Sequence, residues 1–173
     1  MAPNVCSLLC VALLVAGQSA RARLGESPEQ CTERYGKPEV VEAKAPAELK
    51  HIYRVGGMTI TTEFIGGKVA AIFYAKKRRT PFTSEEIEAH MLINGGGKPW
   101  GKMAIIPLGS AGDKIYRWGA QDRAAQYYEG AGLLAFTANV YGEKKRAATE
   151  AEKDNAKNGA AAKPDPAPTS KPE

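Results

Sequence analysis

The sequence predicts an α+β fold of two layers, in which short helices pack on an antiparallel meander sheet. Residues 52–75 contain β-branched and aromatic runs that are separated by two Gly-Gly pairs, and this spacing is typical of two-residue hairpin turns. Helix-start motifs occur at Ser27 and again at Thr83, and strand-like segments follow each of them. A helix followed by several strands is therefore expected twice.

The two Gly-Gly pairs, 56–57 and 66–67, determine the register of the meander if each forms a two-residue loop. One face of the sheet is then apolar and is expected to be core. The opposite face is expected to be only partly polar, because it carries Ile72 and Tyr74 among its polar residues. The cross-strand pairs expected on the core face are Val55 with Met58, Tyr53 with Ile60, Phe64 with Val69, Thr62 with Ala71, and Ile60 with Phe73.

Both expected helices begin with a capping box. The first starts at Ser27, where Pro28 and Gln30 follow in the positions that favour a helix N-terminus, and it ends at Gly36. The second starts at Thr83, which Glu86 follows three residues later, and it ends at 94–95. A basic turn, residues 76–79, lies between the meander and the second helix.

The second half of the chain repeats features of the first half in the same order. Residues 115–119 (IYRWG) repeat residues 52–56 (IYRVG) at an offset of 63, and the Gly-Lys-Pro at 36–38 recurs at 97–99. The ordered matches predict an internal duplication, with repeat units at about 24–79 and 80–142. The second unit also contains the apolar run 103–108, which predicts an additional strand that ends at Pro107.

The N-terminus predicts an export signal. Residues 5–17 are apolar and uncharged, and Ala20-Arg21-Ala22 fits the small-x-small rule for cleavage by signal peptidase. We expect cleavage after Ala22, with the site at 15–17 as the second choice. Thirteen residues are too few to span a bilayer, which needs about 20. The mature chain is thus expected to be extracytoplasmic, either periplasmic or secreted, and to have no transmembrane helix.

Removal of residues 1–22 would leave Cys31 as the single cysteine of the mature chain. A lone cysteine in an oxidising compartment either pairs with a second chain or is buried. We favour burial, because Cys31 lies on a predicted helix face with Leu24 nearby and Tyr35 four residues later.

Charge and composition separate the expected domain, residues 23–142, from a tail. The domain contains 16 Lys and Arg against 13 Asp and Glu, a balance that argues against a nucleic-acid groove. Residues 143–173 contain no aromatic residue and no apolar residue larger than Ala. We expect a disordered tail there, with at most a transient helix over 143–157.

No catalytic, metal or cofactor motif is present. His51 and His90 lie outside the spacings of metal sites, and both are expected at the surface or at a helix edge. The Gly-Gly-Gly-Lys run at 95–98 follows a predicted helix and precedes Pro99, unlike a phosphate loop. We therefore expect a protein that is not an enzyme and that has no cofactor.

The sequence resembles the β-lactamase-inhibitor-protein-like superfamily, which includes the SmpA/OmlA type of outer-membrane lipoprotein. The resemblance is carried by residues 25–31 (Gly-x-Ser-x-x-Gln-Cys), by residues 35–38 (Tyr-Gly-x-Pro), by Tyr53 and by Phe64, with a looser second copy from Thr83 onward. It implies small two-layer α+β modules that bind other proteins and have no catalytic site. This sequence departs from the pattern in lacking a lipobox.

The leading functional hypothesis is an exported, non-enzymatic module that binds a protein or a cell-envelope component through its sheet face. Aromatic residues are the usual anchors of interfaces, and whichever of them point outward should mark the binding face. The alternative is a binder of polyanions or of the envelope surface that uses the basic patch Lys76, Lys77, Arg78 and Arg79. The aromatic candidates are Tyr53, Trp100, Tyr116, Trp118 and Tyr128.

Overall fold

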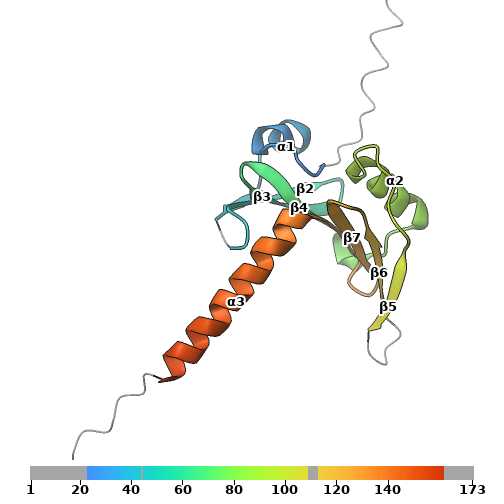
Figure 1. Ribbon diagram of the computed structural model, residues 1–173. Coiled ribbons are helices and arrows are strands. Elements are labelled where there is room, and N and C mark those ends of the chain that lie inside the picture. The colour runs from blue at the N-terminus through green and yellow to red at the C-terminus, as the bar shows by residue number, and fades with distance from the viewer. Residues whose placement is uncertain (1–22, 44, 109–112, 162–173) are drawn as a thin grey trace, which may run out of the picture.

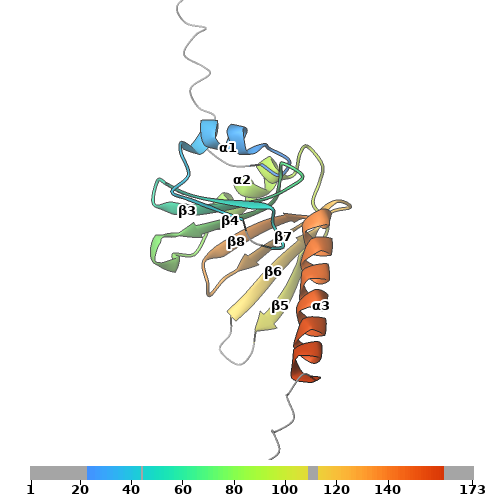
Figure 2. The ribbon, with the colours of Figure 1, turned by 90° about the vertical axis from the view of Figure 1, so that its left-hand side faces the viewer.

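The computed structural model describes residues 23–43, 45–108 and 113–161, and the predicted export signal lies outside these residues. One antiparallel sheet of eight strands, in the order β1-β2-β3-β4-β8-β7-β6-β5, forms the body (Figure 1). Helices α1 and α2 lie over one face, and α3 leaves from the other side (Figures 1 and 2). The predicted α+β fold is therefore confirmed.

The elements alternate as helix, four strands, helix, four strands, helix. The helices are α1 (Pro28–Tyr35), α2 (Ser84–Asn94) and α3 (Asn139–Ala161), and a short 3-10 turn, η2, covers Lys77–Arg79. The strands are β1 (Val40–Glu42), β2 (Leu49–Val55), β3 (Met58–Ile65), β4 (Lys68–Lys76), β5 (Ala104–Leu108), β6 (Asp113–Gly119), β7 (Arg123–Tyr128) and β8 (Leu133–Ala138).

Both capping boxes form as the sequence predicted. The Ser27 backbone N–H donates to the side chain of Gln30 at 2.8 Å, and the Ser27 hydroxyl accepts from the Gln30 backbone N–H. Thr83 and Glu86 make the same reciprocal pair at the start of α2. Gly36 ends α1 with a φ of 82°, a value that few residues other than glycine adopt.

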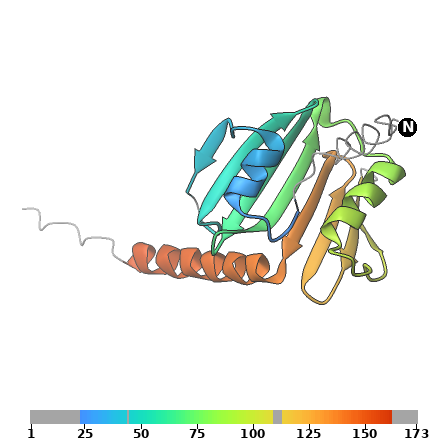
Figure 3. The same cartoon turned by 90° about the horizontal axis from the view of Figure 1, so that it is seen from above.

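The strand order is symmetric about the centre of the sheet: β1–β4 run inward from one edge, and β5–β8 run inward from the other edge in the same order. We name α1 with β1–β4 the first unit, and α2 with β5–β8 the second unit. The units join through antiparallel pairing of β4 with β8. Seen from above, α1 lies over the strands of the first unit and α2 over those of the second (Figure 3). The origin of this repetition in an internal duplication stays a prediction.

The register of the meander agrees with the prediction near its turns and departs from it further along. Val55 faces Met58, Tyr53 faces Ile60, and Phe64 faces Val69, as expected. A β-bulge then shifts the pairing of β3 with β4, because Ala70 has no partner in the ladder.

The bulge makes two of the expected pairs wrong, since Thr62 faces Ile72 instead of Ala71, and Ile60 faces Tyr74 instead of Phe73. A shift of one residue moves every later side chain to the opposite face. Ile72 and Tyr74 therefore point into the core under α1 and α2, and both are fully buried.

One continuous core runs under α1 and α2 through both units. The members are apolar side chains of both helices and of the central strands. Phe136 of β8 lies at the junction of the units, where it packs edge-on against Tyr74 and 5.8 Å from the ring of Trp100. The buried core residues are Cys31, Tyr53, Ile60, Phe64, Val69, Ile72, Tyr74, Phe82, Met91, Ala125, Tyr127, Leu134 and Phe136.

Both histidines are buried, so their expected place at the surface was wrong. His51 lies beside Tyr53, with 2.9 Å between its Nδ1 atom and the tyrosine hydroxyl, and it packs edge-on against Phe64. Burial lowers the pKa of His51 below its usual value. His90 packs against the rings of Tyr74 and Phe82. Each ring fills core space that an apolar residue could occupy.

The opposite face of the sheet carries a smaller apolar cluster. Tyr141, in the first turn of α3, packs with Ala70, Ala71 and Phe73. Among the described residues, no helix combines the length and the apolar composition that crossing a bilayer requires.

The structure differs from the expected tail, because α3 continues without interruption to Ala161. The docked side chain of Tyr141 and the ion pair of Lys144 with Glu48, at 2.6 Å, hold the first turns. Docking of this kind offsets the cost of helix nucleation, and the Ala, Lys, Glu and Arg that follow are strong helix formers. Residues 162–173 of the expected tail lie outside the described residues.

The central position of Phe136 makes it a test of the shared core. We expect Phe136→Ala to lower the free energy of unfolding by about 3–5 kcal/mol, because it removes a fully buried ring and leaves a cavity. Equilibrium unfolding in urea measures the change. Val41→Ala on the exposed strand β1 is the control, with an expected cost below about 1 kcal/mol. Equal costs for the two variants would contradict the shared core.

Cys31 is free and fully buried, as the sequence favoured. Burial raises the pKa of its thiol to about 12, so the reactive thiolate is scarce at neutral pH. We expect iodoacetamide at pH 8 to leave Cys31 unmodified in the native chain and to modify it fully in urea. Peptide mass mapping distinguishes it from Cys6 and Cys10. Rapid native labelling, or a dimer linked through Cys31, would contradict its burial.

Candidate functional site

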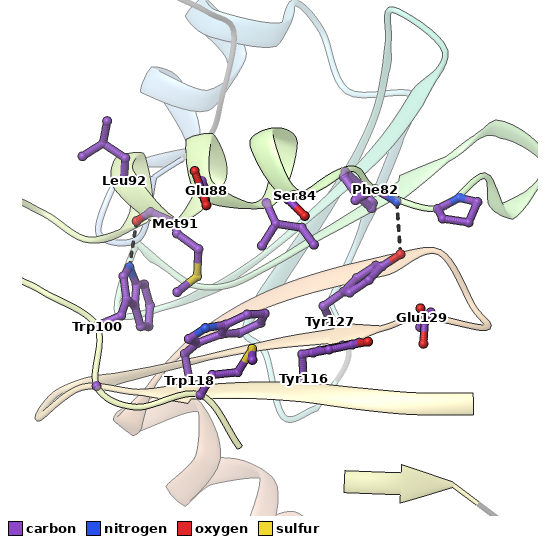
Figure 4. A pocket seen from close by; sticks show the side chains of 14 residues that line it. Phe82, Ser84, Glu88, Met91, Leu92, Trp100, Tyr116, Trp118, Tyr127 and Glu129 are labelled. Atoms are coloured by element: carbon purple, nitrogen blue, oxygen red, sulfur yellow. Dashed lines mark hydrogen bonds between the residues drawn. The ribbon is translucent and has the colours of Figure 1, made fainter. Parts of the chain in front are cut away.

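The second unit contains an open cleft between α2 and the strands beneath it. We name this space the aromatic cleft, and it has a volume of about 740 Å³ (Figure 4). Its walls come from the start of α2, the body of α2, the loop 100–103 and strands β6 and β7. The lining residues are Pro81, Phe82, Ser84, Ile87, Glu88, Met91, Leu92, Trp100, Gly101, Met103, Tyr116, Trp118, Tyr127 and Glu129.

Three stacked aromatic rings form the floor of the aromatic cleft. Tyr116 and Trp118 alternate along β6, so both point toward α2, and Tyr127 is the cross-strand partner of Tyr116 on β7. The Tyr116 ring lies 6.4 Å from the Trp118 ring and 5.9 Å from the Tyr127 ring, and both pairs are close to parallel. Tyr116 and Trp118 are only partly buried, so the floor presents ring faces to the open space.

Two hydrogen bonds hold α2 above this floor (Figure 4). At one end, the indole N–H of Trp100 donates to the backbone carbonyl of Met91 at 2.8 Å. At the other end, the Tyr127 hydroxyl accepts from the backbone N–H of Phe82 at 3.1 Å. Burial raises the pKa of Tyr127, which favours its protonated form. The two bonds therefore tie backbone groups of α2 and of the residue before its N-cap to side chains that line the cleft.

The aromatic cleft differs in charge from the whole chain. The formal net charge of the chain is +5, yet the charged side chains in the lining are Glu88 on α2 and Glu129 after β7. Within the described residues, neither carboxylate takes part in an ion pair. The lining therefore combines aromatic rings, two thioethers and two carboxylates.

The corresponding space of the first unit is filled. Tyr53 occupies on β2 the place that Tyr116 occupies on β6, but it is only 1% exposed. Tyr35 of α1 packs 5.1 Å from the Tyr53 ring, and Cys31 is fully buried beside it. Cys31 thus packs as part of the core beneath α1. Tyr53 therefore cannot anchor a partner, and its inclusion among the candidate binding residues was wrong.

The remaining aromatic candidates separate onto two faces. Trp100, Tyr116 and Trp118 line the aromatic cleft together. Tyr128 points to the opposite face of the sheet, where its hydroxyl donates to Gln126 and its ring borders a smaller hollow of about 250 Å³ near Arg79. The five aromatic candidates thus do not form one surface.

Sequence reasoning missed the helix side of the aromatic cleft. Ile87, Glu88, Met91 and Leu92 fall on neighbouring positions of α2 and line the cleft, with Ile87 and Met91 more buried than the exposed Glu88 and Leu92. The spacing of Ile87 and Met91 was visible in the sequence, but it indicated only a buried helix stripe. The sequence held no signal for the cleft itself, because the partial exposure of Tyr116 and Trp118 depends on where α2 packs.

The basic turn supplies fewer free cations than the sequence indicated. Lys76 is the last residue of β4, where it pairs with Glu86 at 2.6 Å and lies 5.1 Å from the centre of the Phe82 ring. Partial burial raises the pKa of Glu86, but hydrogen bonds from Lys76 and from the Thr83 backbone outweigh it and lower that pKa overall. Lys77, Arg78 and Arg79 are exposed.

Comparisons with known proteins return no family model and no curated protein that matches this chain. Among solved structures, an extracellular protein with an SCP domain from Bacillus anthracis is 14% identical, with a TM-score of 0.44. The match covers 71% of this chain and 46% of that protein. A cysteine-rich secretory protein from Staphylococcus aureus is 10% identical, with a TM-score of 0.39, and the match covers 66% of this chain and 44% of that protein.

A DUF4309 family protein from Bacillus subtilis is 11% identical with a TM-score of 0.37, covering 65% of this chain and 78% of its own. The chain spans less than half the length of the first two proteins. TM-scores below 0.5 do not establish a shared fold, and the functional argument therefore depends on the aromatic cleft. Within the described ranges, no group of three His, Cys, Asp or Glu side chains could hold a metal ion.

Removal of the Tyr127 hydroxyl tests whether its hydrogen bond connects the start of α2 to the sheet. We expect Tyr127→Phe to lower the free energy of unfolding by about 1–3 kcal/mol, because the buried N–H of Phe82 would lose its acceptor. Tyr128→Phe, one residue further along, is the matched control with an expected cost below about 1 kcal/mol, since that hydroxyl bonds only to the partly exposed Gln126. Thermal and urea unfolding measure both. A larger loss for Tyr128→Phe would contradict the proposed tie.

Proposed function

We propose that this chain is an exported, non-enzymatic binding module that holds a segment of another protein or envelope component in the aromatic cleft. The observation that carries the proposal is the cluster of Trp100, Tyr116 and Trp118, which line one open space and are only partly buried. Trp and Tyr supply large contact areas and polar tips, and they dominate the energetics of interfaces.

Apolar surface continues from the aromatic cleft onto both rims. On the sheet side, Ile105 of the edge strand β5 is the cross-strand partner of Tyr116, so it shares the face of the floor, and it is 53% exposed. On the helix side, Leu92 is 78% exposed. Large apolar side chains that continue a cleft onto its rims are characteristic of interaction sites. A partner that filled the cleft could also cover these rims.

The aromatic cleft is also suited to binding because it is already formed. The hydrogen bonds of Trp100 and Tyr127 hold α2 at its present distance from β6 and β7. A preformed site avoids part of the ordering cost that a flexible surface pays on association.

The export part of the proposal is based on the signal predicted at residues 1–22. We also propose kinship with the β-lactamase-inhibitor-protein-like modules, and the two-layer build of both units supports this. The basic turn supports a polyanion site less well, because Lys76 is already paired with Glu86. We therefore place the binding function in the second unit.

Trp118 is the residue to test first, and the two tryptophans of the chain both line the aromatic cleft. Peptides selected on the purified chain from a random phage-displayed library serve as the probe, and calorimetry measures their affinity. We expect Trp118→Ala to weaken binding by about tenfold or more, as loss of a central aromatic anchor does. Binding to the native chain should also change the tryptophan fluorescence.

Tyr128→Ala is the matched control, because Tyr128 lies on the opposite face of the sheet. We expect this variant to bind the selected peptides as the native chain does. Ligands that lose affinity in Tyr128→Ala and keep it in Trp118→Ala would place the binding surface on the other face and refute the proposed site.

A further inference from the structure

The two carboxylates of the aromatic cleft lack the partners that neighbouring acidic residues have. Glu86 is paired with Lys76, and it lies only two residues before Glu88 on the same helix. Glu88 and Glu129 line the cleft, and neither takes part in an ion pair within the described part of the chain, although Glu129 also borders the smaller hollow that Arg79 and Lys114 line. Although the chain has an overall excess of Lys and Arg, the charged residues in the lining of this cleft are thus both acidic.

The ends of the aromatic cleft show how a cation is accommodated here. At one end, Lys76 lies 5.1 Å from the centre of the Phe82 ring, and at the other end the Arg123 guanidinium lies 5.3 Å from the centre of the Trp100 ring. Both are cation–π contacts in the usual distance range. Among the described residues, the middle rings, Tyr116 and Trp118, have no such cation.

The lining can also hold an apolar side chain beside a cationic one. Met91 on α2 and Met103 after the loop both contribute to the walls, and methionine adapts its shape to irregular apolar groups. A volume of about 740 Å³ lies in the range of pockets that enclose ligands much larger than a single amine. The space therefore fits a short segment of chain better than a small cation.

We infer that the aromatic cleft recognises a peptide segment of a partner protein in which a Lys or Arg lies next to an apolar residue. The cationic group lies over the rings of Tyr116 and Trp118 and is attracted by Glu88 and Glu129. The neighbouring apolar side chain contacts Met91 and Met103. Charge complementarity is the basis of this assignment. This inference rests on the proposed function, because it uses the same cleft, and it adds the chemical class of the partner.

The double variant Glu88→Gln with Glu129→Gln tests this inference, because it keeps the shape of the lining and removes its charge. The probes are the peptides selected on the native chain. We expect these peptides to contain Lys or Arg beside an apolar residue, and their affinity to fall by about tenfold in the double variant. Binding should also weaken when the salt concentration is raised, since exposed charges are screened.

Glu85→Gln is the matched control, because Glu85 lies in the first turn of the same helix and does not line the aromatic cleft. We expect its affinity for the peptides to equal that of the native chain. A loss in Glu85→Gln equal to that of the double variant would show a general charge effect and overturn the inference.

The experiment separates the failure of this inference from the failure of the proposed function. Selected peptides without Lys or Arg, or peptides that bind the double variant unchanged but lose affinity in Trp118→Ala, overturn the charge inference and leave the aromatic cleft as the site. Peptides insensitive to both the double variant and Trp118→Ala overturn both proposals.

A second copy of the chain is the competing occupant, because its exposed turn 77–79 is basic. Sedimentation of the purified chain at micromolar concentration tests this arrangement. A monomer supports a separate partner. A dimer that dissociates both in the Glu88→Gln with Glu129→Gln variant and in an Arg78→Glu with Arg79→Glu variant would identify the second copy as the occupant and overturn the inference.

Discussion

The pairing of β4 with β8 is the interaction on which the rest of the structure depends. It joins two units whose sheets would otherwise each present an unpaired edge, and it places Ile72 opposite Phe136 and Tyr74 opposite Leu134 at the centre of the core. All four side chains are fully buried, so this pair of strands contributes apolar surface from both units to one core. Both helices pack on the common face that this pairing creates, so the position of α2 over the second unit follows from it.

The two units use the same order of elements for different purposes. In the first unit, Cys31 and Tyr35 bring α1 close to the sheet and Tyr53 becomes part of the core. In the second unit, Trp100 donates a hydrogen bond to Met91 of α2, Tyr127 accepts one from Phe82 just before α2, and Tyr116 stays partly exposed. The space under α1 is therefore filled, while the second unit retains an open cleft.

Much of the fold could be predicted from residues that are close in sequence. Ser27 and Thr83 start their helices as expected, and the Gly-Gly turns pair the strands beside them in the expected register. The errors arose further from these signals. No sequence pattern predicted the bulge at Ala70, so Ile72 and Tyr74 were assigned to the wrong face of the sheet. Of the candidate site, Trp100, Tyr116 and Trp118 were named in advance, but their separation from Tyr53 and Tyr128 was not foreseen.

The sequence by itself determined where helices begin, where hairpins turn and which residues alternate along a strand, because capping, turn geometry and strand periodicity act between near neighbours. Only the tertiary structure decided that Tyr53 is buried while Tyr116 is partly exposed, that Glu88 and Glu129 share one cleft, and that α3 continues past the sheet. These outcomes depend on how closely each helix approaches the sheet. That distance is set by contacts between residues far apart in the chain, such as Tyr127 with Phe82, which no local pattern encodes.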